Sequence, residues 1–167
     1  MSIQRILISC LCLFVLCFTG CSPQDSETAS SNGEHSIVSH AALQPSKVDD
    51  KTLNTVKELS IRTEKTSYSP GTVEIWLILS NRTNKELRFG DEFTLQVKQN
   101  GQWMEIPMLP EAYFYAISNG LPANDDLTWL ALLSKFDFDA GPGQYRIIKP
   151  ISYGGKDSLF SAEFTIQ

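Results

Sequence analysis

The chain has no cysteine beyond residue 21. Its 4 cysteines are Cys10, Cys12, Cys17 and Cys21. The rest of the sequence therefore has no thiol with which to form a disulfide, even in an oxidising compartment. A domain built from that part must be held together by burial of apolar surface.

Histidine and the common catalytic motifs are also missing from the larger part of the chain. The 2 histidines, His35 and His40, lie before residue 57, in a polar stretch with no cysteine beside them. The remainder has no Gly-x-Ser-x-Gly motif and no glycine-rich phosphate loop. Asp125-Asp126 and Asp137-Phe138-Asp139 lack the spacing of a calcium-binding loop. We expect no enzyme, no metal and no cofactor, and a carboxylate pair is the one catalytic arrangement left open.

An excess of positive charge is absent as well. Removal of residues 1–20, whose only charged residue is Arg5, would leave 13 basic against 19 acidic residues, a net charge of −6. Nucleic-acid-binding domains usually carry a basic stripe. We therefore expect no nucleic-acid partner.

No apolar run is long enough to cross a membrane, which takes about 20 residues. The longest one, Ile6–Phe18, follows Arg5 and ends in small residues, as in a secretory signal. The four residues Phe18-Thr19-Gly20-Cys21 resemble the bacterial lipoprotein signal, although that family prefers Leu where this chain has Phe18. The resemblance implies cleavage after residue 20 and acylation of Cys21. An ordinary secretory signal cut elsewhere, or an uncleaved one, is the alternative.

Residues 21–56 are predicted to be the lipidated cysteine and a flexible tether. The stretch is rich in Ser, Asp, Glu, Thr, Asn and Gln, and it has few large apolar residues. Such a composition buries too little surface to offset the entropy of ordering. We expect the anchor to hold the chain on the extracytoplasmic side of a cell membrane, inner or outer.

Residues 57–167 alternate between apolar and polar residues with the period of two that is typical of half-buried strands. The pattern is clearest over 73–80, 93–98 and 159–166, and residues 127–133 form another, strongly apolar strand. Asn100-Gly101 predicts a tight hairpin, and Gly154-Gly155 joins the last two strands. No amphipathic stretch has the length of a crossover helix. The sequence predicts an all-β, antiparallel sandwich of seven to eight strands.

Several segments resemble one group of bacterial Ig-like domains, which are common in lipoproteins and other envelope proteins. They are Tyr68-Ser69-Pro70-Gly71, Phe89-Gly90-Asp91-Glu92-Phe93, Gly101-Gln102-Trp103 and the run from Asp139 to Arg146. The chain is more distantly similar to the intracellular proteinase inhibitors of spore-forming bacteria. The resemblance implies an immunoglobulin-like fold, with Tyr145 as a structural tyrosine whose hydroxyl bonds the backbone upstream.

The most informative candidate for a binding site is the run Tyr113-Phe114-Tyr115. Three consecutive aromatic residues cannot all face one side of a regular element, so some should be exposed, as at recognition sites. We predict a partner-binding patch of Tyr113, Phe114, Tyr115 and Trp103. The alternatives are a lid over one end of the sandwich for the first three and simple packing for Trp103.

The sequence therefore predicts a non-catalytic binding module on a bacterial membrane, with an envelope or extracellular protein or a glycan as its partner. The second hypothesis is a proteinase inhibitor that acts through an exposed loop. Its candidate loops are Pro107–Pro110 and the aromatic segment.

Overall fold

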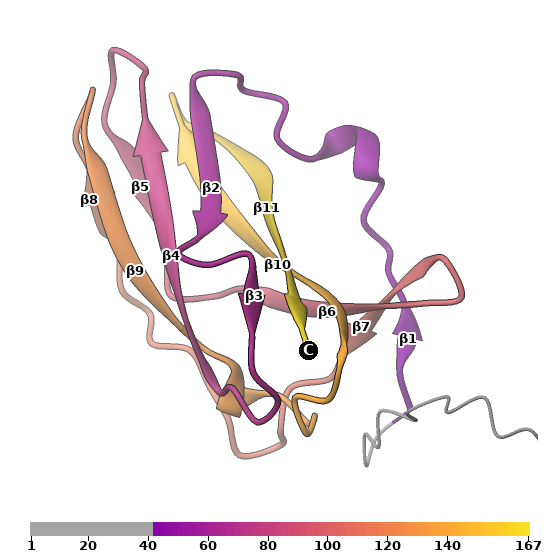
Figure 1. Cartoon of the computed structure of the whole chain (residues 1–167). Coiled ribbons are helices and arrows are strands. Elements are labelled where there is room, and N and C mark those ends of the chain that lie inside the picture. Colours follow the sequence, from indigo (N-terminus) through magenta and orange to yellow (C-terminus); the bar gives the residue numbers. More distant parts are fainter. Residues whose placement is uncertain (1–41) are drawn as a thin grey trace, which may run out of the picture. The chain divides into compact units, whose positions relative to one another are not determined.

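The computed structural model describes residues 42–167, and strands dominate them (Figure 1). The strands are β1 (Gln44–Pro45), β2 (Leu59–Thr63), β3 (Ser67–Tyr68), β4 (Glu74–Asn81), β5 (Leu87–Phe89), β6 (Thr94–Gln99), β7 (Gln102–Ile106), β8 (Asn119–Leu121), β9 (Asp126–Leu132), β10 (Gly143–Tyr153) and β11 (Lys156–Ile166). Two 3-10 turns, η1 (Asp50–Thr52) and η2 (Leu133–Lys135), are the only helical elements of this part. Seven strands have five residues or more. The predicted all-β class is confirmed.

The strands form two sheets. Sheet A has the order β1-β7-β6-β10-β11-β3, and β5, which also pairs with β8, lies beside the far end of β10. Sheet B has the order β2-β4-β9. All pairs are antiparallel except β3 beside β11. The long β10 therefore changes neighbour, from β6 at Tyr145–Ile148 to β5 at Ser152–Tyr153.

The core lies between the sheets, and the alternation in the sequence decides which side chains enter it. On β4, Ile75, Leu77 and Leu79 are buried, whereas Trp76 between them is exposed. The apolar face predicted for the last strand is buried too, from Phe160 to Ile166 at every second position. Each fully buried side chain of this kind contributes about 1.5–3 kcal/mol. This packing lets the sandwich form without a disulfide.

Two tight hairpins set the register of sheet A. Asn100 and Gly101 have φ values of 49° and 80°, and Gly154 and Gly155 have φ values of 59° and 77°. A two-residue turn with positive φ at both positions matches the right-handed twist of the strands it joins. The first turn aligns β6 with β7, and the second aligns β10 with β11 over their whole lengths.

The folded part begins before the predicted boundary at residue 57. Residues 44–56, here called the strap, run along sheet A: β1 pairs with β7, and Leu53 forms a parallel bridge with Leu159 on β11. The tether prediction is therefore corrected for these residues. The strap is held mainly by backbone and polar contacts, so its low apolar content gave no sign of order. The predicted signal (1–20), Cys21, His35 and His40 lie outside the described residues.

No helix within residues 42–167 is long and apolar enough to span a membrane.

Candidate functional site

The aromatic run divides between the two sides of its loop. Tyr113 and Tyr115 are each 59% exposed, whereas Phe114 between them is half-buried. The Phe114 ring packs against Phe93 and Phe136, with centroids 5.3 and 6.5 Å away. Phe114 thus closes one end of the sandwich, while its two neighbours form an exposed pair, here called the tyrosine ridge. Both interpretations of the run apply, to different residues.

The tyrosine ridge is held in one arrangement by its neighbours. The two rings meet edge to face, with centroids 5.3 Å apart and planes at 79°, and the two hydroxyl oxygens are 3.4 Å apart. This hydrogen bond is the main reason why the pKa of Tyr115 lies above its usual value. Lys135 on η2 donates to the Tyr113 carbonyl oxygen, and its Nζ lies 5.6 and 5.9 Å from the two ring centroids.

Trp103 does not belong to an exposed patch. It lies on β7, on the side of sheet A that faces away from the core, and only 8% of it is exposed. The Arg146 guanidinium carbon lies 4.3 Å from the centroid of its ring, and Lys98 lies 5.4 Å from it. Within residues 42–167, none of the ring contacts joins Trp103 to the tyrosine ridge. The predicted patch is therefore reduced to Tyr113 and Tyr115, because the cation on β10 and the strap cover Trp103.

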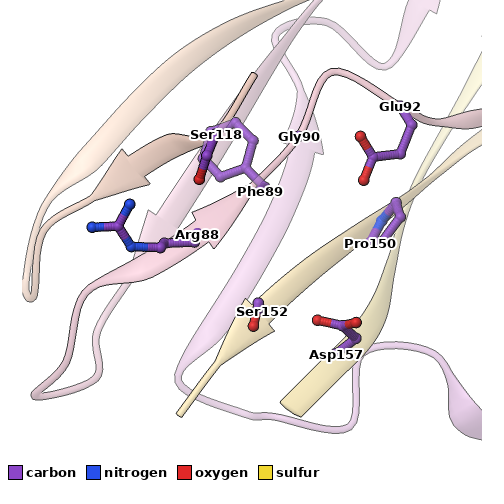
Figure 2. Close-up of a pocket in the computed structure, with 8 residues that line it drawn as sticks. All are labelled: Arg88, Phe89, Gly90, Glu92, Ser118, Pro150, Ser152 and Asp157. Carbon is purple, nitrogen blue, oxygen red and sulfur yellow. The ribbon is translucent and has the colours of Figure 1, made fainter. Parts of the chain in front are cut away.

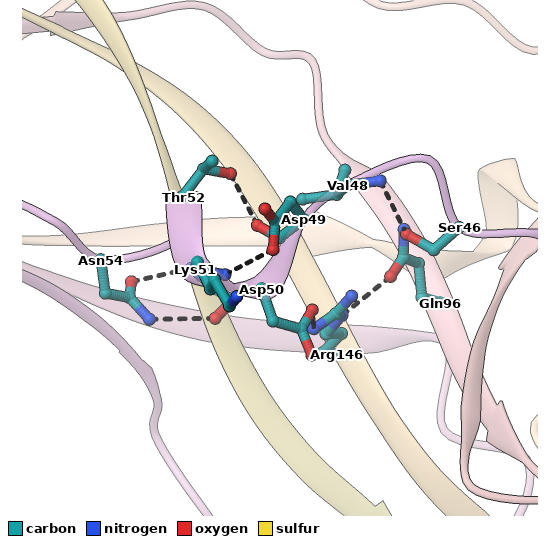
Figure 3. A network of polar contacts seen from close by, with 10 residues as sticks. Ser46, Val48, Asp49, Asp50, Lys51, Thr52, Asn54, Gln96 and Arg146 are labelled. Carbon is teal, nitrogen blue, oxygen red and sulfur yellow. Dashed lines mark hydrogen bonds and ion pairs between the residues drawn. The ribbon is translucent and has the colours of Figure 1, made fainter.

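The strap closes over a buried cation that the sequence analysis missed (Figure 3). Arg146 is 1% exposed. Its Nε donates to Gln96 Oε1 at 2.8 Å, and its Nη1 meets the Asp50 carboxylate at 2.7 Å. Gln96 in turn donates to Ser46 Oγ at 2.8 Å. Only Nη2 of the guanidinium has no partner among the described residues.

A second buried cation, Lys149, lies on the opposite side of the same strand. It shares the inward face of β10 with Tyr145 and Ile147, and it is fully buried. Its Nζ donates to the carbonyl oxygens of Gly90 and Glu92 at 2.9 and 3.2 Å. It also lies 3.7 Å from the centroid of the Trp129 ring. Burial lowers the pKa of Lys149 to about 8, against the opposing effect of Glu92 and Asp91.

Lys149 provides hydrogen bonds at the place where β10 changes its neighbour from β6 to β5. The loop Gly90–Glu92 crosses the gap between β5 and β6, where its carbonyl groups have no strand to bond. The Lys149 amine donates hydrogen bonds to the carbonyl oxygens of Gly90 and Glu92 from the core side of the loop. The alternation over residues 145–151 is the signal in the sequence that places Lys149 inward.

A shallow pocket of about 190 Å³ opens above this gap (Figure 2). Arg88, Glu92 and Asp157 bring one positive and two negative charges to it, and Ser118 and Ser152 add hydroxyl groups. Arg88 also pairs with the Glu86 carboxylate at 3.2 Å. The pocket offers polar groups for a small hydrophilic ligand.

Of the acidic residues in Asp125-Asp126 and Asp137-Phe138-Asp139, Asp126 forms a structural ion pair. The Asp126 carboxylate forms a bidentate pair with Arg82, with both distances between 2.7 and 2.8 Å. This hydrogen bonding lowers the pKa of Asp126. Within residues 42–167, no group of three or more His, Cys, Asp or Glu side chains is arranged to hold a metal ion.

The first candidate inhibitor loop, Pro107–Pro110, is bonded to the chain that follows β9. Met108 forms a bridge with Phe136, and the backbone of Leu109 bonds the Lys135 carbonyl at 2.9 Å. Asp137 donates its N–H to the Pro107 carbonyl at 2.9 Å. These contacts hold Pro107–Leu109 along the chain that follows β9.

Tyr145 lies at the start of β10 with its ring in the core. Its hydroxyl donates to the Gly141 carbonyl oxygen at 2.7 Å, the hydrogen bond expected of a tyrosine at this corner. Burial raises the pKa of the Tyr145 hydroxyl to about 12, and Asp139 adds to the effect. Tyr145 is therefore a structural residue that ties the loop to the strand.

Solved structures resemble this chain only loosely. An alkylpurine DNA glycosylase, AlkC, from Pseudomonas fluorescens, bound to DNA containing an abasic site analogue, is 15% identical with a TM-score of 0.35. The match covers 66% of this chain and 30% of the glycosylase, so the chain spans less than a third of that protein. The PapD-like domain 7 of human CEP192 is 15% identical with a TM-score of 0.29, over 77% of this chain and 93% of that domain. Both scores are too low to inform function.

A comparison with curated protein sequences gives no match. The sequence pattern of a bacterial Ig-like domain, in contrast, matches residues 55–165, which is most of the chain and nearly all of its sandwich. Domains of this family are generally non-catalytic. The chain belongs to the bacterial Ig-like domain family.

Proposed function

We propose that this protein is a lipoprotein, anchored in a bacterial membrane through Cys21, whose Ig-like domain is a non-catalytic binding module. Its partner is a protein or glycan of the cell envelope or the extracellular space. The observation that carries the proposal is the tyrosine ridge, two exposed aromatic side chains in a fixed arrangement at one end of the sandwich.

The ridge has the physical properties of a recognition surface. A tyrosine offers a large apolar ring and a polar hydroxyl, and it loses little conformational entropy on binding because it has few rotatable bonds. Here that loss is reduced further, because the rings contact each other and Lys135 holds the backbone between them. Phe114 anchors the same segment in the core. A partner would therefore meet a surface that is already organised.

The anchor is supported by the sequence alone. Arg5, the apolar run that follows it and Phe18-Thr19-Gly20-Cys21 form the pattern of a lipoprotein signal. Two acyl chains would hold the protein stably, since each buried methylene contributes ~0.8 kcal/mol. The absence of cysteine from residues 22–167 leaves Cys21 as the only thiol of a chain cut after residue 20.

Metabolic labelling with an alkyne-bearing fatty acid tests the anchor. The full chain should take up label and sediment with membranes, whereas Cys21→Ser should do neither. Cys17→Ser is the matched control, and it should be labelled like the parent. Labelling that survives Cys21→Ser would show that the anchor is wrongly assigned.

Binding to an isolated cell-envelope fraction tests the ridge. Because single aromatic residues often dominate an interface, Tyr113→Ala and Tyr115→Ala should each lower the affinity about tenfold. Lys156→Ala, at an exposed turn away from the ridge, is the control and should bind like the parent. Equal binding by all four chains would exclude the ridge as the binding surface.

A further inference from the structure

One long strand of the sandwich has an edge with no partner. β9 pairs with β4 on one side only, and no other described residue pairs with it. The Leu133 N–H bonds the Val73 carbonyl at 2.8 Å, and the Asn81 N–H bonds the Asp125 carbonyl at 3.0 Å. In an antiparallel pair, every second residue directs its N–H and C=O groups to the neighbouring strand. On the β9 side these are the odd-numbered residues from 125 to 133. The N–H and C=O groups of Thr128, Leu130 and Leu132 therefore point away from β4, along the free edge.

The other long edges within residues 42–167 are protected. β1, which contains Pro45, covers β7, and β3 covers the end of β11. The strap covers an earlier part of β11, where the Asn54 N–H bonds the Leu159 carbonyl at 3.0 Å.

The two remaining edges belong to β2 and β8. β8 has three residues, too few to accept a long strand. β2 carries Arg62, and Lys57, Glu58, Glu64 and Lys65 flank it. Charged side chains of this kind are the usual protection of an edge strand against pairing.

β9 is less protected. Its only charged residue is Asp126 at its start, which Arg82 neutralises, and from Leu127 to Leu132 it contains no charged residue and no proline. On the outer face of sheet B, Leu130 lies opposite Trp76, which is 44% exposed. An uncharged edge beside an apolar face is a site where a further strand gains both hydrogen bonds and buried area.

We propose that the β9 edge pairs with the β9 edge of a second copy of this chain, in antiparallel orientation and centred on Leu130. This register sets Leu130 against its own counterpart and Thr128 against Leu132 of the second copy. Thr128, Leu130 and Leu132 of each strand then find hydrogen-bonding partners, and the two sheets B become one continuous sheet.

Charge favours a second copy in this orientation. Asp125 and Asp126 stand at the start of β9, where Arg82 neutralises Asp126, and Lys135 follows its end. Antiparallel pairing brings the acidic end of each copy to the basic end of the other. Parallel pairing would set the acidic ends against each other. This inference does not depend on the tyrosine ridge or on acylation of Cys21.

Cysteine cross-linking of the full chain tests the register. Directly opposed residues of an antiparallel pair have Cα atoms about 5.5 Å apart, within the range of a disulfide. With copper phenanthroline as oxidant, Leu130→Cys should give a covalent dimer, because residue 130 faces itself. Thr128→Cys alone should give about tenfold less, because residue 128 faces residue 132, and Thr128→Cys combined with Leu132→Cys should restore the dimer. The unsubstituted chain measures any cross-linking through its natural cysteines.

A second measurement does not depend on disulfide geometry. In light scattering of the full chain in nonionic detergent, Leu130→Lys should lose the dimer, because it adds the charge that the edge lacks. Ser60→Lys, on the outer face of β2, should keep it. Monomeric unsubstituted chain together with absent Leu130→Cys dimer would overturn the proposal. A Leu130→Cys adduct with a different protein would also overturn it, in favour of a foreign strand at this edge.

Discussion

β10 carries a buried cation on each of its two faces, and the protein accommodates them in different ways. Arg146 faces outward and is covered by the strap, where it meets the carboxylate of Asp50 and the amide of Gln96. Lys149 faces the core and meets two carbonyl oxygens and the ring of Trp129, without a carboxylate in contact. Each cation also lies over a different tryptophan, Trp103 or Trp129.

The difference shows what each neighbourhood can provide. A buried cation is tolerated when its hydrogen bonds are satisfied and its charge is balanced. The strap places the Asp50 carboxylate against Arg146, and the rest of the Asp50 side chain is exposed to water. We call this side of β10 the polar cover. The Lys149 side is an aromatic cover: Phe89 and Trp129 lie beside the amine, and Trp129 packs on the cluster of Phe93, Phe114 and Phe136. Its charge is balanced by carbonyl and ring dipoles and, from a distance, by Glu92 and Asp91. The lowered pKa of Lys149 reflects that weaker compensation.

The largest effect is expected where the aromatic cover is opened. Phe93 contacts Phe114, Trp129 and Phe136, with all three centroids 5.1–5.6 Å away. Phe93→Ala should lower the free energy of unfolding by about 3–5 kcal/mol, because it leaves a cavity among these rings. Urea unfolding followed by tryptophan fluorescence measures the loss. A loss below about 1 kcal/mol would show that the cover is not a packed unit.

The pH dependence of stability separates the two cations. The pKa of Lys149 is about 8 in the folded protein and 10.5 when unperturbed. Above pH 8 the unfolded chain holds more protons at this group than the folded chain does, so stability rises with pH until about 10.5. Between neutral pH and about pH 9.5, the gain should be about 2 kcal/mol.

Lys149→Met should lack this gain, because its side chain does not titrate. The comparison of the two unfolding profiles removes the contributions of all other groups. Measurement should stop near pH 9.5, because the Tyr145 hydroxyl, with its pKa raised to about 12, lowers stability from about pH 10 upward. Parallel profiles for the two chains would contradict the burial of a titrating Lys149.

The polar cover should respond less strongly. Asp50→Asn removes the balancing charge of Arg146 but keeps a hydrogen-bonding oxygen, and water can reach the site because the Asp50 side chain is exposed. We expect a loss of about 1–2 kcal/mol, below the value for a fully buried pair. Asp157→Asn, an exposed carboxylate on β11, is the control and should change the stability by less than about 0.5 kcal/mol. An unchanged stability of Asp50→Asn would show that the strap is not held by this pair.

The smallest effect is expected at Ser46, which accepts a hydrogen bond from Gln96, the partner of Arg146. Ser46→Ala removes the acceptor of the Gln96 amide and should cost about 0.5–1.5 kcal/mol. Combined with Asp50→Asn, the loss should differ from the sum of the single losses, since both residues hold the strap over Gln96 and Arg146. A double-mutant cycle measures this coupling. Strict additivity would show that the two contacts hold the strap independently.

The sandwich could be predicted because its signals are local. Alternation placed Leu77, Phe160 and Phe164 in the core, and Asn100-Gly101 and Gly154-Gly155 predicted turns that are observed. The strap was not predicted, because its order comes from pairing with β7 and β11, which are far away in the sequence. A polar segment that gains its hydrogen bonds from distant strands resembles a disordered one in composition.

The candidate site divides in the same way. Three consecutive aromatic residues already required that some be exposed, and Tyr113 and Tyr115 are. Trp103 was placed with them because a sequence does not show which outward face another segment will cover. Contacts with Arg146 and Lys98 removed it from the surface.

The sequence by itself determined the all-β class, the two tight hairpins and the absence of any thiol after Cys21. These features depend only on residue type and on the alternation of apolar and polar residues along the chain. Only the tertiary structure decided that residues 44–56 lie on sheet A, which tryptophans are covered and how β10 holds a cation on each face. Those features depend on which distant segments lie side by side. Their energies come from burial and from hydrogen bonds between residues whose separation along the chain carries no local pattern.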